Sequence, residues 1–172
     1  PEPQKKTFKR VLVANRGEIA LRIIRALKEM KIESVALYSN ADSNSQHLRF
    51  ADYAYSLKGH TARDTYLNTD EIIKAIVATK ADAVHPGYGF LAENPKFASQ
   101  IEQDTKAVFI GPSAKSIAFL GDKLKAKEFM KAHKIPTVPG SDTPLSSFKK
   151  TQAAAKDLTY PLILKASFGG GG

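Results

Sequence analysis

The sequence predicts an α/β fold in which a parallel sheet is covered by helices on both faces. Short runs of aliphatic and β-branched residues alternate with helical segments of about 10–15 residues, a pattern typical of parallel sheets. The first run is followed by a glycine turn and an amphipathic segment, which is the opening of a βαβ unit. These two observations also predict right-handed crossovers between the strands.

The expected strands are short apolar runs, each ended by a turn residue. The run VLVA at 11–14 is too short and too rich in β-branched residues for a helix. Pro86 and Gly87 halt the strand at 83–85, and Gly111 ends the strand at 107–110. The complete set of expected strands is 11–14, 35–38, 54–57, 83–85, 107–110 and 161–166.

The expected helices are recognised by a cap residue and an apolar face. The face of the first helix consists of Ile19, Ile23, Ile24, Leu27 and Met30. Asn68 caps the next helix, with Glu71 placed as in a capping box. The buried stripe of that helix is Ile72, Ile73, Ile76 and Val77. Further helices run from Pro95 to about Gln103, from Ser113 to Gly121, from the cap Asp122 to about His133, and over 148–158.

The chain is predicted to hold one domain and the beginning of a second. Residues 1–7 are polar and aperiodic and are expected to form a disordered tail, followed by a first domain over 8–134. Residues 135–147 contain three prolines, a glycine, three serines and two threonines, the composition of a linker. Residues 148–172 start another domain and end in four glycines, which have no side chains to bury. We therefore expect a truncated piece of a longer protein.

Composition excludes several kinds of site. The chain has 26 Lys and Arg against 17 Asp and Glu, and a net charge of +9 suits nucleic acid, anionic lipid or phosphate-bearing small molecules. No groove of alternating arginines and aromatics is present and no apolar stretch reaches ~18 residues, so neither nucleic acid nor a membrane is expected as a partner. The absence of cysteine and the irregular spacing of the four histidines predict no metal site within this chain.

Two glycine-rich segments are candidate binding loops. Residues 87–92 match the dinucleotide pattern G-x-G-x-x-A, but Pro86 precedes them and no acidic residue ends the second strand. A tight turn at the carboxyl edge of the sheet, where ligands bind in open α/β folds, is the preferred interpretation. At the end of the chain, Lys165 precedes a glycine run, as in a flap whose amides cover phosphate, with a flexible linker as the alternative.

Five collinear segments identify a family resemblance. VLVANRGEIALRIIRA, HPGYGFLAEN, FIGPSAKSIAFLGDK, VPGS and LILKASFGGGG together closely resemble the amino-terminal part of biotin carboxylase, the ATP-grasp component of acetyl-CoA, propionyl-CoA and pyruvate carboxylases. The resemblance implies a Rossmann-like pre-ATP-grasp domain with a parallel sheet, plus the first strand of an ATP-grasp domain. It also implies an ATP-dependent ligase that carboxylates carrier-bound biotin from bicarbonate through carboxyphosphate, with Mg²⁺.

The resemblance also implies roles for individual residues. Lys123 and Lys165 would contact ATP, and the glycines that would close over its phosphates are Gly169, Gly170, Gly171 and Gly172. Tyr88 would lie at the biotin pocket. Arg22, Arg25 and Glu29 share one face of the first helix and would belong to a homodimer contact, although a solvated face is the alternative from spacing alone.

The resemblance implies that the family's Mg²⁺-binding glutamates, bicarbonate-binding arginine and general base lie beyond Gly172. The chain alone is therefore expected to be catalytically incomplete, and we assign it no catalytic residue. Its expected partners are a biotin carboxyl carrier protein or domain and a carboxyltransferase, in the cytoplasm or, in a eukaryote, the mitochondrial matrix. A folding or dimerisation module and another ATP-grasp ligase, such as a carbamoyl-phosphate synthase half, are the alternatives. The acyl acceptor stays open.

Overall fold

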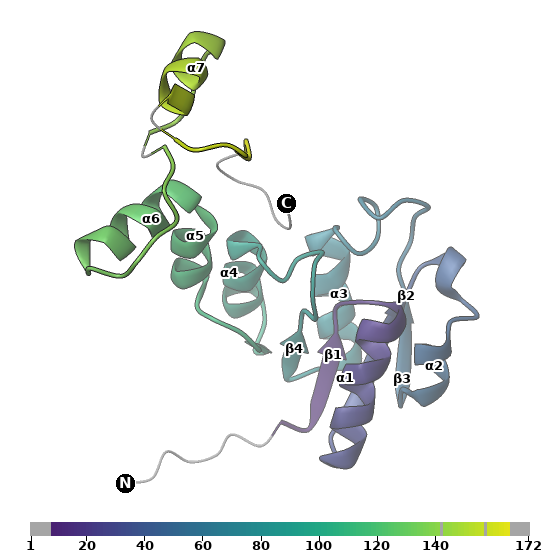
Figure 1. Cartoon of the computed structure of the whole chain (residues 1–172). Coiled ribbons are helices and arrows are strands. Elements are labelled where there is room, and N and C mark those ends of the chain that lie inside the picture. Colours follow the sequence, from purple (N-terminus) through teal and green to yellow (C-terminus); the bar gives the residue numbers. More distant parts are fainter. Residues whose placement is uncertain (1–7, 142, 157, 166–172) are drawn as a thin grey trace, which may run out of the picture. The chain divides into compact units, whose positions relative to one another are not determined.

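A five-stranded parallel sheet forms the centre of the first part of the chain (Figure 1). The computed structural model describes residues 8–141, 143–156 and 158–165 of the 172-residue chain. The strands are β1 (Arg10–Val13), β2 (Glu33–Tyr38), β3 (Tyr53–Ser56), β4 (Ala83–His85) and β5 (Val108–Phe109), in the order β3-β2-β1-β4-β5. Every neighbouring pair is parallel, which confirms the predicted fold class.

Helices cover both faces of this sheet. Figure 1 shows α1 (Gly17–Glu29) in front of the sheet and α3 (Thr69–Thr79) behind it. Adjacent residues of β5 point to opposite faces, as the strand period requires. Val108 packs with the cluster around α1, whereas the Phe109 ring meets the edge of Phe97 in α4 (Pro95–Asp104) at a centroid distance of 6.2 Å. The two faces therefore have separate apolar cores.

The helix caps predicted from the sequence are present. The Asn68 side chain accepts a hydrogen bond from the Glu71 backbone N–H at 3.2 Å, at the start of α3. The Glu71 carboxylate pairs with Lys74 at 2.7 Å. Asp122 caps α6 (Lys123–Ala132) by accepting from the Leu124 and Lys125 backbone N–H groups. These bonds satisfy donors that the first turn of a helix leaves unpaired.

Several sequence predictions differ from the structure. The short helix α2 (Gln46–Phe50) and the 3-10 turn η1 (Asn40–Asp42) were not expected. Met30, predicted on the apolar face of the first helix, is 66% exposed, and Val77, predicted in the buried stripe of the next helix, is 62% exposed. The predicted strand at 161–166 is wrong for the described part of it, since 161–165 form no strand and their side chains are exposed. A strand needs a neighbour to pair with, and the described residues supply none there.

The chain divides into two compact units between Ala114 and Lys115. Sequence composition placed the linker later, at 135–147. The second unit contains α6 and α7 (Phe148–Lys156), and α5 (Ala114–Gly121) begins at the boundary. Neither α6 nor α7 has a fully buried residue. Within the second unit, Phe119 and Phe129 meet edge to face at 5.2 Å.

Neighbouring residues of α3 provide a test of the core. Ile76 is 2% exposed and Val77 is 62% exposed. We expect Ile76→Ala to lower the free energy of unfolding by about 2–5 kcal/mol, because it leaves a cavity behind the sheet. Val77→Ala, the matched control, should change it by less than about 0.5 kcal/mol. Urea denaturation followed by circular dichroism measures both values. Equal losses of unfolding free energy would contradict the orientation of α3, in which Ile76 faces the core and Val77 faces solvent.

Candidate functional site

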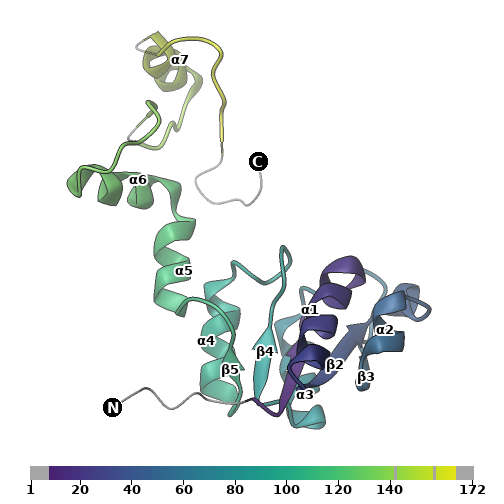
Figure 2. The same cartoon turned by 60° about the horizontal axis from the view of Figure 1, so that its bottom comes forward.

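The sheet changes its winding direction between β1 and β4, which lie side by side (Figure 2). The chain passes from β1 to β2 and β3 on one side, and then crosses to β4 and β5 on the other. In open parallel sheets, ligands bind beyond the carboxyl ends of the strands at such a switch point. The candidate site is therefore formed by the loops that follow β1, β2 and β4.

A single buried amide joins the loops after β1 and β4. The Asn15 side chain is 1% exposed, and its Nδ2 group donates to the carbonyl oxygens of Pro86 at 3.0 Å and Tyr88 at 2.8 Å. Its Oδ1 atom accepts from the Arg16 backbone N–H at 2.9 Å. The Ala14 N–H also donates to the His85 carbonyl at 2.9 Å. These bonds fix the turn at 86–88 against the end of β1.

The turn after β4 requires glycine at position 87. Gly87 has φ +68°, in the left-handed region, and a Cβ atom there would lie 2.6 Å from Nδ2 of Asn15. The Gly87 N–H donates to Nδ1 of His85 at 3.0 Å. Burial lowers the pKa of His85, which favours the neutral ring that can accept this hydrogen bond. The predicted tight turn at the carboxyl edge is thus confirmed.

A second network joins the loops after β1 and β2. Arg16 Nη1 lies 3.2 Å from Oδ1 of Asp42. The other carboxylate oxygen of Asp42 accepts from the Ser39 hydroxyl at 2.8 Å and from the Tyr66 hydroxyl at 2.7 Å. The Tyr66 oxygen also accepts from the Ser39 backbone N–H at 3.0 Å. Both polar side chains at the centre of this network, Asp42 and Tyr66, are buried.

The environment shifts the pKa values of both groups. Burial by itself would raise the pKa of Asp42, but hydrogen bonds from Tyr66 and Ser39, and then the Arg16 charge, outweigh it and hold that pKa below the usual value. Burial, followed by the bond to Asp42, raises the pKa of Tyr66 to about 12. Asp42 is therefore ionised and Tyr66 is neutral around neutral pH.

Aromatic rings extend this network to the segment after β4. Tyr66 and Phe90 stack with ring centroids 5.2 Å apart. The Arg16 guanidinium lies 5.7 Å from the Tyr66 centroid and 5.9 Å from the Phe90 centroid, within the range of a cation–π interaction. Arg16 thus contacts the segments that follow β2 and β4 at once.

A pocket of about 370 Å³ adjoins the turn after β4. It is lined by Glu18, Ile19, Arg22, Ile23, His85 and Gly87. Its wall on the α1 side therefore includes Arg22, one of the residues that the resemblance associates with a homodimer contact.

The sequence-predicted site residues fall in two groups. Tyr88 is 78% exposed at the turn after β4, and Arg22, Arg25 and Glu29 are exposed on α1. The Arg25 guanidinium lies 5.2 Å from the centroid of the Phe50 ring. Lys123 is the first residue of α6, and Lys165 is an exposed residue of the second unit. Gly169, Gly170, Gly171 and Gly172 lie outside the described residues.

Sequence reasoning missed three central residues of the site. Asn15 was read only as part of a turn, and Tyr66 was not singled out. The sequence indicated no acidic residue at the end of the second strand, yet η1 brings the buried Asp42 back to that edge. The only local signal was the polar Asn15-Arg16 pair directly after a buried strand.

The described residues contain no group of three or more His, Cys, Asp or Glu side chains able to hold a metal ion. Among their helices, none has the length and apolar character needed to cross a bilayer.

Five parallel strands in this order, with a switch point between β1 and β4, define an α/β domain of the Rossmann-like class. Residues 7–117 match the family model described as "Biotin carboxylase, N-terminal domain". This match covers more than half of the chain, which therefore belongs to the biotin carboxylase N-terminal domain family. Residues 122–172 match a second model, described as "Carbamoyl-phosphate synthase L chain, ATP binding domain".

Related proteins agree with this assignment. The chain is 50% identical over 165 residues to the 2-oxoglutarate carboxylase small subunit of Hydrogenobacter thermophilus, covering 96% of this chain and 34% of that protein. It is also 50% identical over 166 residues to a biotin carboxylase of Pseudomonas aeruginosa, covering 96% of this chain and 37% of that protein. The chain thus spans about a third of the length of these curated relatives.

Solved structures give the same result. The biotin carboxylase domain dimer of the Hydrogenobacter thermophilus enzyme, in complex with MgADP, ADP and bicarbonate, superposes with a TM-score of 0.88 at 49% identity, covering 96% of this chain and 36% of that one. A biotin carboxylase complex from Campylobacter jejuni gives a TM-score of 0.88 at 42% identity, with 96% and 37% covered. The family resemblance seen in the sequence is therefore confirmed.

The Asp42 network can be tested by removing one hydroxyl. We expect Tyr66→Phe to lower the free energy of unfolding by about 1–3 kcal/mol, because the buried Asp42 carboxylate and the Ser39 N–H each lose a partner. Asp42 contributes stability that is complete above its unfolded pKa of 3.8 and is lost as the pH falls through its lower folded value. The variant should therefore lose less stability than the wild type on acidification below that pH.

Tyr53→Phe is the matched control for this experiment. The Tyr53 hydroxyl makes an exposed 3.3 Å contact with Glu33, and we expect a change of less than about 0.5 kcal/mol. Urea titrations at several pH values measure both variants. Equal, small effects would show that the Tyr66 hydroxyl does not support the buried carboxylate.

Proposed function

We propose that the chain is the amino-terminal part of an enzyme that uses ATP and bicarbonate to carboxylate biotin on a carrier protein, through carboxyphosphate. The observation that carries this proposal is the family match over residues 7–117. The match to a biotin carboxylase domain bound to MgADP and bicarbonate supports it further, at 49% identity over nearly the whole chain. Because the chain spans about a third of such relatives, the activity belongs to the longer protein.

Lys123 and Lys165 are proposed as ATP contacts. Both are exposed lysines of the second unit, and both fall in the segment that matches an ATP-binding domain model. Ammonium groups suit the polyanionic phosphates and the acceptor atoms of adenine. Gly169, Gly170, Gly171 and Gly172 fall in the same matched segment and are proposed to cover the phosphates with their backbone N–H groups.

Magnesium ligands are proposed to come from other parts of the longer protein. Mg²⁺ takes carboxylate and phosphate oxygens, and the described residues hold no suitable group of three acidic or histidine side chains. Bound Mg²⁺ would neutralise phosphate charge during phosphoryl transfer. This chain's own contribution is one wall of the nucleotide site, and we propose that it is catalytically incomplete on its own.

Tyr88 is proposed to lie at the biotin pocket, and α1 at a homodimer contact. The exposure of Tyr88 leaves its ring available to a ligand, and Arg22, Arg25 and Glu29 are exposed on α1. A related biotin carboxylase domain was solved as a dimer. A biotin carboxyl carrier protein or domain and a carboxyltransferase are the proposed partners, with a cytoplasmic or mitochondrial location.

Curated relatives of this chain are named for different substrates. Relatives named 2-oxoglutarate carboxylase, propionyl-CoA carboxylase and urea amidolyase are 50%, 43–44% and 48% identical to this chain. The substrates in their names differ, although their sequence identities to this chain are similar. The chemistry proposed for this part of the chain, biotin carboxylation, is the step before the acceptor is reached.

The incompleteness of the isolated chain is directly testable. We expect no bicarbonate-dependent ATP hydrolysis and no carboxylation of free biotin, because phosphoryl transfer needs charge-stabilising groups that we propose to come from other parts of the longer protein. ADP release measured with bicarbonate and biotin should equal the buffer blank. Turnover above the blank that disappears in Lys165→Ala would refute the expectation, whereas turnover that survives Lys165→Ala would indicate a contaminant.

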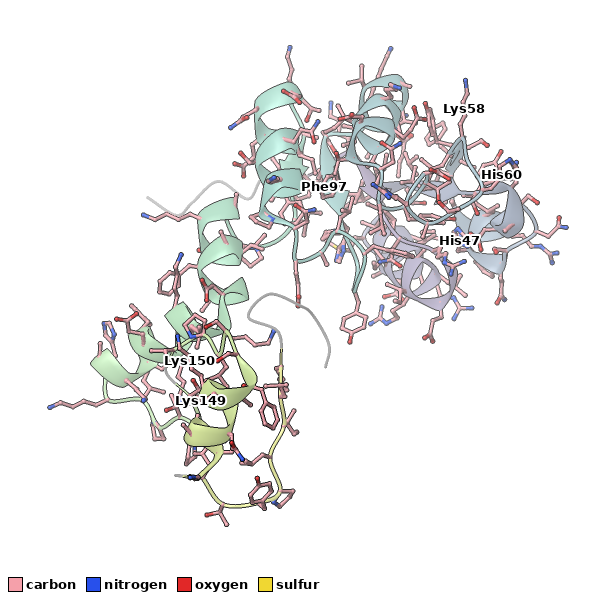
Figure 3. The ribbon with its side chains drawn as sticks, turned by 90° about the horizontal axis from the view of Figure 1, so that it is seen from above. His47, Lys58, His60, Phe97, Lys149 and Lys150 are labelled. Carbon is pink, nitrogen blue, oxygen red and sulfur yellow. The ribbon has the colours of Figure 1, made fainter. Side chains whose placement is uncertain are left out.

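The proposed ATP contact of Lys165 predicts a binding defect in the longer protein. Loss of a charge-assisted hydrogen bond in Lys165→Ala should weaken ATP binding about 10- to 150-fold. Lys165→Arg should restore it only in part, because a planar guanidinium cannot replace a compact ammonium. Lys149→Ala on α7 (Figure 3) removes an exposed lysine outside the proposed contacts and serves as the control. If Lys165→Ala binds ATP like the control in calorimetry, the nucleotide site lies elsewhere.

A further inference from the structure

We infer that Asn15 is a positioning residue for biotin binding, acting through the backbone that carries Tyr88. This inference rests on the proposed function, in which Tyr88 lies at the biotin pocket. Asn15 itself is buried at 1% exposure and does not need to touch the ligand. Its side chain sets where the turn after β4, and therefore the Tyr88 ring, is placed.

The exposure of Tyr88 makes its backbone the feature that fixes it. With 78% of its surface exposed, the ring is not held by packing within the first unit. The position from which the ring projects therefore depends on the backbone dihedral angles of residues 86–89. Gly87 and Gly89 have φ +68° and +70°, in the left-handed region that glycine adopts readily. Glycine can also adopt many other backbone conformations, so these two residues do not fix the shape of the turn by themselves. Such a flexible turn presents a ring reproducibly only if another group holds it.

Asn15 supplies that restraint with two N–H donors from one side chain. Nδ2 binds the carbonyls on both sides of Gly87, those of Pro86 and Tyr88, at 3.0 and 2.8 Å. The Gly87 N–H is held separately by Nδ1 of His85 at 3.0 Å. The turn wraps the amide so closely that a Cβ atom on Gly87 would lie 2.6 Å from Nδ2. The amide and the turn are therefore complementary in shape as well as in hydrogen bonding.

The position admits few other side chains. Aspartate has the same shape as asparagine but no N–H donors, so its carboxylate would face two carbonyl oxygens. Glutamine carries an additional methylene, for which a residue with 1% exposure leaves no space. The amide is also oriented from its other end, because Oδ1 accepts from the Arg16 N–H, and Arg16 pairs with Asp42. The turn that carries Tyr88 is thus held by Asn15 and is linked through Arg16 to the buried network around Asp42.

The test uses the longer carboxylase with free biotin as substrate. We expect Asn15→Asp to raise the KM for biotin about tenfold or more, while the KM for ATP changes less than about twofold. Hydrogen exchange of the backbone amides of residues 87–89 should become faster in the variant. Asn94→Asp is the matched control, because Asn94 caps α4 through its acceptor oxygen, which aspartate retains. The control should leave both KM values unchanged.

A double-mutant cycle separates this inference from the proposed function. Tyr88→Ala should raise the KM for biotin, and adding Asn15→Asp to it should cause little further change, since both act through one ring. No effect of Tyr88→Ala would refute the placement of Tyr88 at the biotin pocket. An effect of Tyr88→Ala without one of Asn15→Asp would overturn the role of Asn15 alone.

The inference can also be tested if the Asn15→Asp variant fails to fold. If Asn15→Asp does not fold, Asn15→Ala replaces it, because alanine removes the two donors without placing a charge against the carbonyls. A rise in the KM for ATP as large as the rise for biotin, with a lowered melting temperature, would show a general structural role and overturn the inference.

Discussion

The hydrogen bonds from Asn15 to the turn after β4 are the constraint on which the candidate site depends. They join the two strands at which the sheet changes direction, and therefore determine the shape of its carboxyl edge. A buried amide with both ends bonded has no low-energy alternative, because each unmade bond would leave an unsatisfied polar group. Through this amide, the turn carrying Tyr88 becomes part of the rigid sheet although its own residues include two glycines with positive φ.

The network around Asp42 engages an acidic residue that follows the second strand. In dinucleotide-binding members of this class, an acidic residue that follows the second strand binds a ribose hydroxyl. Asp42 lies after β2, but its oxygens are engaged by Arg16, Ser39 and Tyr66. Arg16 in turn faces the Tyr66 and Phe90 rings. The Asp42 carboxylate is thus engaged by side chains of the chain itself.

The two units differ in how far their apolar residues are buried. The first unit buries apolar residues on both faces of its sheet, with Val11 and Val13 on one face and Phe97 on the other. The second unit exposes apolar residues such as Ile163 and Leu164, which are 81% and 75% exposed. Its segment matches an ATP-binding domain model.

The sequence by itself determined the features that depend on nearby residues. The strand-helix alternation, the caps Asn68 and Asp122 and the glycine turn after β4 each have a signal within a few positions of the chain, and the motif set identified the family. Sequence alone did not indicate the five-residue helix α2, which is too short for a helical period, or the exposure of Val77.

Only the tertiary structure revealed the partners of Asn15, which lie 71 and 73 positions away in the sequence, and the burial of Asp42 against Tyr66. The predicted strand at 161–166 failed in its described part for the same reason, since apolar composition permits a strand but a neighbouring strand has to pair with it. Local propensity is a property of the sequence itself. Hydrogen bonds between distant loops exist only after the crossovers of the sheet have brought those loops together.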